Sequence, residues 1–277
     1  MTDPVRWGIL GTGWIAGQFA QGLAQLSEAE LVAVGSRTPE LAQRFGAQHD
    51  VPHRHGSYRA LAEDAGVDVI YVATPNPWHR EHTLLCLDSG KPVLCEKPFA
   101  LNAGQAAEMI RAAREKELFL MEAMWTRFFP LMGKVRALVS EGAIGEVQML
   151  VADLCIQFDF DPSDRRYALE LGGGALLDLG VYPLSFASMI MGSPSKIEAL
   201  AHVGETGVDE QAGIVLGYDR GRVSTLYTSI RVDSPVEAIL LGTRGQIRIQ
   251  DWWIHPHRLT LSVSGEEATA IEMPYTG

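Results

Sequence analysis

Two short stretches of the chain carry side chains that could transfer a proton. Asp178 and Tyr182 stand four residues apart in an apolar stretch, so a carboxylate and a phenol share one face of an expected helix. Lys97 stands between Glu96 and Pro98, at the expected end of a strand. A phenol can act as a general base at a hydroxyl group, and a neighbouring lysine can lower its pKa. We therefore predict that Lys97, Asp178 and Tyr182 are catalytic, with Tyr182 as the base.

Each of these residues also has a plainer interpretation. Lys97 could form a structural ion pair beside a rigid turn. Asp178 could be a buried structural acid, and Tyr182 could be a core aromatic residue with a satisfied hydroxyl group. The expected position of Lys97 at the carboxyl edge of a sheet, where α/β proteins bind ligands, favours the catalytic interpretation.

A glycine-rich stretch near the N-terminus predicts a nucleotide site. Residues 11–16 read G-T-G-W-I-A between an apolar strand and an expected helix. Gly11 allows a tight turn, and Gly13 lets the backbone approach a phosphate. Trp14 and Ile15 begin a helix whose first N–H groups attract an anion. The pattern predicts binding of a dinucleotide pyrophosphate, and a glycine turn that binds nothing is the alternative.

The residues after the second expected strand indicate which dinucleotide binds. NAD sites usually place an acid there for the ribose 2′-hydroxyl, whereas NADP sites need a cation for the 2′-phosphate. This chain has Ser36, Arg37 and Thr38, with no acid before Glu40. Arg37 can pair with phosphate, and the two hydroxyl groups can donate hydrogen bonds. We predict NADP, with NAD as the second choice; a solvated surface arginine is the plainer alternative.

Parallel strands end at the same edge of a sheet, so residues that follow two later strands are also expected to contact the cofactor. These residues are Thr74, Pro75, Asn76, His79, Glu96 and Lys97. For His79, an ordinary position early in a helix is the alternative.

The order of expected elements predicts an α/β protein with two domains. Up to residue 123, expected strands alternate with expected helices, as in a parallel doubly wound sheet. The strands lie at 5–10, 31–35, 67–73, 92–95 and 118–123, and the helices at 14–26, 39–46, 78–89 and 102–117, the last with Asn102 as its expected cap. Farther on, helices at 130–141 and 175–191 and a strand at 146–158 are expected. Short alternating strands then indicate a mostly antiparallel open sheet. We predict a dinucleotide-binding Rossmann domain at 1–123 and a substrate-binding and dimerisation domain at 124–277.

Composition argues against several classes of function. The 277 residues include 23 basic and 34 acidic side chains, and the net charge of −11 argues against nucleic acid as a partner. The apolar stretch at 179–192 is too short to span a membrane, and no signal peptide fits before the first strand. Three cysteines without pairs or metal-like spacing predict a reducing compartment. We therefore expect a cytoplasmic protein without membrane partners.

No cluster of cysteine, histidine and carboxylate residues indicates a metal site. His53 and His55 flank Arg54 without acidic neighbours, so we expect them to face solvent. A late strand is expected to carry further packing or interface residues, namely Trp252, Trp253, His255 and His257.

Together, several motifs resemble the glucose-fructose oxidoreductase/inositol dehydrogenase family. Besides G-T-G-W-I-A, they are A-T-P-N-P-W-H at 73–79, C-E-K-P at 95–98, M-E-A-M-W-T-R-F at 121–128 and G-G-G-A-L-L-D-L-G-V-Y-P at 172–183. Within that family the chain is most similar to the dimeric dihydrodiol dehydrogenases and the NADP-dependent D-xylose dehydrogenases, because Tyr182 stands where many relatives have histidine. The resemblance covers essentially the whole chain.

The resemblance implies roles for individual residues. Lys97 is the catalytic lysine of E-K-P, and Asp178 and Tyr182 are the acid and the phenol of D-x-x-x-Y. Aromatic residues that line the substrate pocket of the dihydrodiol group correspond to Trp125 and Phe158. The expected substrate contacts are Trp125, Arg127, Phe158 and Asp178.

The expected activity is hydride transfer between NADP and a secondary alcohol of a sugar or a cyclic diol. Two alternatives stay open: a carbonyl or deoxysugar reductase of the same family, and a non-catalytic regulator that senses a dinucleotide.

The resemblance further implies a homodimer formed through the C-terminal sheet. Family members usually continue beyond an element like Pro274–Gly277, so we expect a C-terminal segment of the family to be missing from this chain. The last strands carry apolar side chains that we expect to need a cover, namely Trp252, Ile254, Leu259, Leu261 and Val263.

Overall fold

The computed structural model describes residues 3–274 of the chain. The chain divides into two compact units, of which unit 1 extends to Ala123 and unit 2 begins at Met124. The element expected at 274–277 lies outside the described residues, apart from Pro274.

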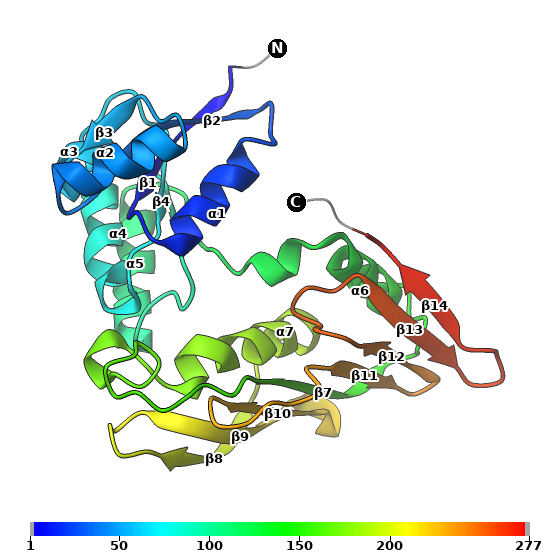
Figure 1. Ribbon diagram of the computed structural model, residues 1–277. Helices are drawn as coiled ribbons and strands as arrows, with labels where there is room; N and C mark the ends of the chain where they lie inside the picture. The colour runs from blue at the N-terminus through cyan, green and yellow to red at the C-terminus, as the bar shows by residue number, and fades with distance from the viewer. Residues whose placement is uncertain (1–2, 275–277) are drawn as a thin grey trace. The chain divides into compact units, whose positions relative to one another are not determined.

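Unit 1 contains a parallel sheet, which in the described part of the chain has six strands in the order β3-β2-β1-β4-β5-β6. Figure 1 labels β1 to β4 of this sheet. The order reverses between β1 and β4, and in open α/β sheets ligands bind at the carboxyl ends of the strands at such a reversal. The strand expected at 5–10 is confirmed. The strands are β1 (Val5–Leu10), β2 (Ala29–Gly35), β3 (His53–His55), β4 (Val69–Val72), β5 (Val93–Cys95) and β6 (Leu120–Glu122).

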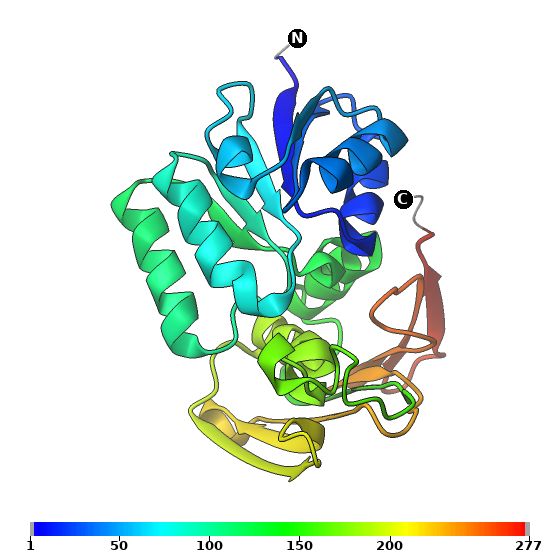
Figure 2. The same ribbon diagram turned by 60° about the vertical axis from the view of Figure 1, so that its left-hand side comes forward.

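Helices cover both faces of this sheet. One face packs against side chains of α1 and α2, with Ile9 and Tyr71 at the centre. The other face packs against α3, α4 and α5, and α4 and α5 lie side by side (Figure 2). The bounds are α1 (Trp14–Leu23), α2 (Pro39–Gln48), α3 (Tyr58–Ala62), α4 (His79–Asp88) and α5 (Ala103–Glu115).

Short polar side chains begin three of these helices, because an oxygen acceptor satisfies an N–H group of the first turn. Asn102 accepts a hydrogen bond from the N–H of Gln105 at 3.0 Å, which confirms the cap expected for α5. Thr38 and Ser57 do the same for α2 and α3. By contrast, α1 ends three residues before the expected position.

Unit 2 is built on a mostly antiparallel sheet, as expected. Within residues 124–274 the sheet has eight strands in the order β14-β13-β12-β11-β7-β10-β9-β8, and only β7 and β10 pair in parallel. The strands are β7 (Val147–Cys155), β8 (Lys196–Val203), β9 (Asp209–Gly217), β10 (Val223–Ser229), β11 (Ala238–Gly242), β12 (Gly245–Ile249), β13 (Arg258–Val263) and β14 (Thr269–Glu272).

One face of the unit 2 sheet is covered and the other is open. Two helices, α6 (Pro130–Ser140) and α7 (Val181–Met191), pack with the covered face in one apolar core. The strand register places alternate residues of β7 to β10 together on the opposite face. We call this the outer face, and its exposed apolar side chains are Met149, Leu200, Val215 and Tyr227.

The expectation of a late strand carrying Trp252 to His257 is wrong. These residues form the connection between β12 and β13, because Asp251 and Trp252 have left-handed φ values of 54° and 65° that no regular strand tolerates. Trp253 is buried, and its ring nitrogen donates a hydrogen bond to the backbone oxygen of Asp153 at 2.6 Å.

The structure already buries two of the five apolar residues that we expected to need a partner's cover. Leu259 is fully buried and Ile254 is nearly so, both within the core of unit 2. Leu261 and Val263 are only partly buried, and Trp252 is 49% exposed. Further exposed apolar side chains lie on the outer face.

One helical stretch, Leu169–Met191, is long and apolar enough to cross a membrane by length and composition alone. It exceeds the apolar stretch noted at 179–192 because two short helical turns, Leu169–Leu171 and Leu176–Gly180, precede α7. Of its most apolar window, 56% is buried inside the protein, and Phe186 and Ala187 belong to the core. Core helices have this composition.

Candidate functional site

The glycine-rich loop after β1 has the geometry that a pyrophosphate requires. Gly11 has a φ of +118°, and a Cβ atom there would lie 2.8 Å from the carbonyl oxygen of Ala73, so only glycine fits. A Cβ atom on Gly13 would meet none of the described atoms within 4 Å, so space is open in front of α1. Among the described residues, no side chain caps α1. The N–H groups of its first turn can therefore receive an anion.

The loop after β2 carries the residues expected to select the dinucleotide. The buried Ser36 hydroxyl lies 3.3 Å from the hydroxyl of Thr12, which joins this loop to the glycine loop. Thr38 caps α2 through the N–H of Leu41. Arg37 is exposed, and within residues 3–274 its guanidinium pairs with no carboxylate. A cation is thus placed next to the positive end of a helix dipole.

His79 joins the loops that follow β4 and β5. Its Nε2 lies 2.7 Å from the carbonyl oxygen of Thr74, and its Nδ1 lies 2.8 Å from that of Pro98. Burial lowers the pKa of His79, and a neutral imidazole has one N–H, which can donate to one carbonyl at a time. The Thr74 hydroxyl in turn lies 2.9 Å from Nδ1 of His82. His79 was predicted as a cofactor contact, but both ring nitrogens face backbone carbonyls.

Two glutamates hold the E-K-P loop. Glu96 is buried, and its carboxylate accepts hydrogen bonds from the Tyr71 hydroxyl and, at 3.0 Å, from the N–H of Lys97. Burial raises the pKa of Glu96, against the opposing effects of the Tyr71 hydrogen bond and the Lys97 charge. Glu122, at the end of β6, accepts from the N–H of Phe99 at 3.0 Å. Sequence reasoning missed Tyr71 and Glu122, because the contacts join residues 25 and 23 positions apart.

In unit 2, a glycine turn leads into the helix that bears the predicted acid and phenol. Gly174 has a φ of +117°, and a Cβ atom there would lie 2.3 Å from a carboxylate oxygen of Asp209. Asp209 accepts from the N–H of Leu176 at 2.7 Å. The next turn, Leu176–Gly180, is a π-helix that contains Asp178, and α7 follows with Tyr182 in its first turn. Such π-turns inside helices often occur at functional sites.

Asp178 is buried and carries a bidentate ion pair. Arg165 donates from its two terminal nitrogens to the two carboxylate oxygens at 2.9 and 3.3 Å. The neighbouring Arg166 pairs with Asp164, and its guanidinium lies 3.8 Å from the centre of the Phe158 ring. Neither arginine was predicted as a site residue; the only signal was the polar composition of the loop at 159–166.

Tyr182 lies in a cluster of rings. Its side chain is buried, and its ring centre lies 5.7 Å from that of Trp125 at an interplanar angle of 72°. The ring centre of Trp125 also lies 4.5 Å from that of His255 and 5.6 Å from that of Phe129. Partial burial lowers the pKa of His255, which disfavours the charged form of its ring. These rings place an apolar surface beside the phenol.

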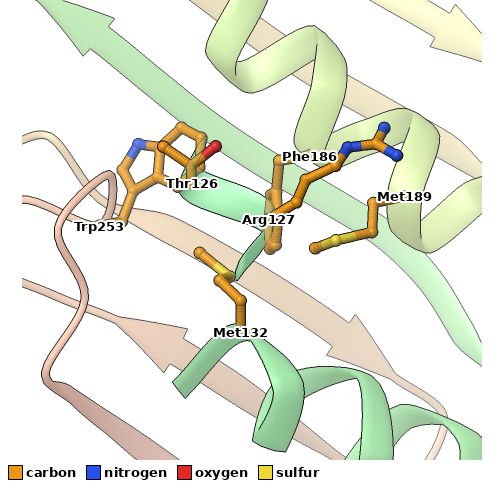
Figure 3. Close-up of a pocket in the computed structure, with 6 residues that line it drawn as sticks. All are labelled: Thr126, Arg127, Met132, Phe186, Met189 and Trp253. Atoms are coloured by element: carbon orange, nitrogen blue, oxygen red, sulfur yellow. The ribbon is translucent and has the colours of Figure 1, made fainter. Parts of the chain in front are cut away.

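Arg127 was predicted as a substrate contact, and in the structure its side chain forms hydrogen bonds within unit 2. Its guanidinium donates to the hydroxyl and the backbone oxygen of Ser185 at 2.8 and 2.9 Å, which ties the turn Trp125–Phe128 to α7. The side chain extends along a small recess toward α7 (Figure 3). The recess is lined by Thr126, Arg127, Met132, Phe186, Met189 and Trp253.

The predicted residues thus form two groups, one in each unit. Unit 1 holds the glycine loop, the loops after β2 and β4, and Lys97. Unit 2 holds Asp178 and Tyr182, with Trp125 and Phe158. The roles of these residues in binding and catalysis stay predictions.

Comparisons with known proteins agree with this architecture. Residues 5–124 match the oxidoreductase family with an NAD-binding Rossmann fold, and residues 132–248 match the GFO/IDH/MocA C-terminal domain. The chain is 40% identical over 276 residues to the trans-1,2-dihydrobenzene-1,2-diol dehydrogenase of Xenopus tropicalis, covering 98% of this chain and 82% of that protein.

Two solved structures are similar over nearly the whole chain. KijD10, a 3-ketoreductase from Actinomadura kijaniata in complex with NADP and TDP-benzene, has a TM-score of 0.86 at 28% identity, covering 98% of this chain and 85% of that one. The aldose-aldose oxidoreductase from Caulobacter crescentus has a TM-score of 0.90 at 26% identity, covering 99% and 85%.

The resemblance noted in the sequence is therefore confirmed, as are the α/β fold and the NAD-binding Rossmann unit. The two matched segments and the 40% identity over almost the whole chain show that this protein belongs to the GFO/IDH/MocA family of oxidoreductases.

Proposed function

We propose that this protein is an NADP-dependent dehydrogenase that oxidises a secondary alcohol of a sugar or a cyclic diol. The observation that carries the proposal is the buried Tyr182 phenol, which follows a buried carboxylate by four residues and lies among aromatic rings, in a family of oxidoreductases.

The roles that we propose are those that residue chemistry and the resemblance to the family imply. Tyr182 removes the hydroxyl proton as general base, and Lys97 lowers the pKa of the phenol and holds the substrate oxygen. Asp178, held by Arg165, orients the reacting groups. When bound, the dinucleotide supplies the hydride acceptor, C4 of its nicotinamide.

The preference for NADP rests on Arg37. Its guanidinium is exposed beside the N-terminus of α2, and an arginine can bind a phosphate through two hydrogen bonds. The glycine loop and the first turn of α1 would hold the pyrophosphate, with Thr74, Pro75 and Asn76 as further contacts. The solved structure of KijD10 contains NADP, which supports the same choice here.

The proposed substrate class rests on the aromatic residues of unit 2. Trp125 and Phe158 offer flat apolar surfaces that suit the ring of a diol or a sugar. The similarity to trans-1,2-dihydrobenzene-1,2-diol dehydrogenases points the same way. A reductase acting in the opposite direction is the second candidate, because KijD10 is described as a 3-ketoreductase.

We also propose a homodimer formed through the outer face of the unit 2 sheet, and a cytoplasmic location. The outer face exposes Met149, Leu200, Val215 and Tyr227, an arrangement that a symmetric partner could cover. The three cysteines are buried and free, as suits a reducing compartment.

The test is a spectrophotometric assay of NADP and NAD reduction over a panel of aldoses and cyclic trans-diols. We expect turnover of at least one panel member with NADP. Oxidation of NADPH by ketoses or ketodeoxysugars alone would favour the reductase. Dinucleotide binding without turnover in either direction would favour a regulator and contradict the proposal.

A further inference from the structure

Three side chains far from the predicted catalytic residues in the sequence meet at the edge of the unit 1 sheet. β3 is an edge strand, and alternate residues of a strand project to the same face, so His53 and His55 project together. Nδ1 of His53 lies 2.7 Å and Nε2 of His55 lies 2.8 Å from the same oxygen of Asp64. The expectation that no acid lies near these histidines is therefore wrong.

From this geometry we propose that His53, His55 and Asp64 bind a divalent transition-metal ion of the Zn²⁺ class. Their three ligand atoms lie within 4.8 Å of one another. Imidazole nitrogen and carboxylate oxygen are ordinary ligands of zinc, and atoms about 2.1 Å from a tetrahedral ion lie roughly 3.4 Å apart. The observed 2.7 and 2.8 Å separations from the Asp64 oxygen need to open by about 0.6–0.7 Å for an ion to take the place of the protons in these two hydrogen bonds.

The surrounding structure orients the cluster. The second oxygen of Asp64 accepts the N–H of Gly66 at 2.7 Å, which fixes the carboxylate plane. The backbone oxygen of His55 accepts the N–H of Ser36 at 3.0 Å, which fixes the strand. Outer contacts of this kind orient metal ligands. The Asp64 side chain is only 10% exposed, whereas that of His53 is 49% exposed, so an ion would be open to water on the His53 side.

Nearby positive charge limits the affinity of this site. Nζ of Lys91 lies 2.7 Å from the carbonyl oxygens of both Asp64 and Val67. Hard ions such as Mg²⁺ and Ca²⁺ bind poorly to a single carboxylate, and the Lys91 ammonium at the backbone of Asp64 weakens them further. Imidazole ligands instead favour Zn²⁺, Ni²⁺ and Cu²⁺. The proposed site is therefore exchangeable and selective for these softer ions.

Binding can be measured on the full chain without a histidine tag after treatment with a chelator. Calorimetric titration with Zn²⁺ should show one site per chain, and Co²⁺ should produce the visible absorption bands of a tetrahedral complex. Asp64→Asn and His53→Gln should each weaken Zn²⁺ binding at least about tenfold. His257→Gln, which changes an exposed histidine in unit 2, should leave the affinity unchanged.

Absence of saturable binding, or equal affinities of all three variants, would show a hydrogen-bonded cluster only and overturn the proposal. His53 is half exposed, so His53→Gln keeps the test valid if Asp64→Asn fails to fold. The readout is binding, not turnover, so it is independent of the proposed dehydrogenase activity.

Discussion

At the scale of single residues, Arg37 is the side chain on which the choice of dinucleotide depends. Replacing it in Arg37→Asp should weaken NADP binding roughly ten- to a hundredfold, because one charge-assisted hydrogen bond contributes about 1.5–3 kcal/mol. NAD binding should change little. Fluorescence titration of both dinucleotides measures this, with Arg44→Asp, an exposed arginine on α2, as the matched control. Equal affinities for NADP and NAD in the unaltered protein would contradict the assignment.

Tyr182 and Lys97 are the residues that the proposed chemistry needs. Tyr182→Phe removes the proposed base and should lower kcat by about 10²–10⁴, with NADP affinity nearly unchanged. Lys97→Met should be at least as damaging and should change the pH dependence of the rate. Steady-state kinetics over pH 5–10 would show both effects.

A suitable control is Tyr218→Phe, which removes another buried phenol of unit 2, one that accepts a hydrogen bond from Ser224 at 3.3 Å. This variant should have a kcat within a few-fold of that of the unaltered protein. Normal turnover in both Tyr182→Phe and Lys97→Met would mean that hydride transfer, if it occurs, uses other residues.

At the scale of elements, His79 holds two loops of unit 1 together through the carbonyls of Thr74 and Pro98. His79→Leu should lower the free energy of unfolding by about 1–3 kcal/mol, because a buried carbonyl loses its donor. It should also lower kcat/KM, since the loops bear Thr74 and Lys97. Urea denaturation and kinetics test this, with His49→Leu at a half-exposed position after α2 as the control. Unchanged stability would show that His79 does not hold the loops.

The packing of α4 also predicts how stability depends on pH. Burial lowers the pKa of His82 from 6.5 to about 4, because the charged ring is disfavoured between Tyr58 and Trp78. Between pH 6.5 and 4, the unfolded chain therefore takes up a proton that the folded protein does not bind. The contribution of His82 to the free energy of unfolding is thus complete above pH 6.5, and it declines as the pH falls from 6.5 to 4.

Near pH 4.5, the free energy of unfolding should be lower than at neutral pH by on the order of 2 kcal/mol because of His82. Urea unfolding at pH 7.5 and 4.5 measures it, and His82→Gln should show a correspondingly smaller difference between the two pH values. An identical difference in both proteins would exclude His82 as the cause.

At the scale of the whole molecule, the outer face of unit 2 predicts the oligomeric state. Light scattering should give a dimer at micromolar concentration, because a stable interface buries at least about 1,200 Å². Leu200→Asp should shift the protein toward the monomer, since Leu200 is 83% exposed on that face. Ile197→Asp changes an equally apolar exposed residue on the opposite face of β8, so it should leave the dimer intact. A monomer in the unaltered protein would refute the dimer.

Much of the fold was predictable because its signals are local. Apolar runs bounded by turns gave the strands of unit 1 within a few residues, and the cap at Asn102 marked the start of α5. β3 was missed because its three residues, His53 to His55, have no apolar pattern. The π-turn at Leu176–Gly180 was missed because the same residues would also suit an α-helix.

By itself, the amino-acid sequence determined the family, the α/β class and the dinucleotide loop. Glycine positions, strand ends and motif spacing are properties of neighbouring residues, so they can be recognised without knowledge of the tertiary packing. Only the tertiary structure decided which distant side chains meet: Arg165 with Asp178, Tyr71 with Glu96, and both histidines of β3 with Asp64. It also decided that Ile254 and Leu259 lie in the core of unit 2 while the outer face exposes apolar side chains. Such contacts depend on how whole elements pack, because the burial of apolar faces is a collective property that no local spacing encodes.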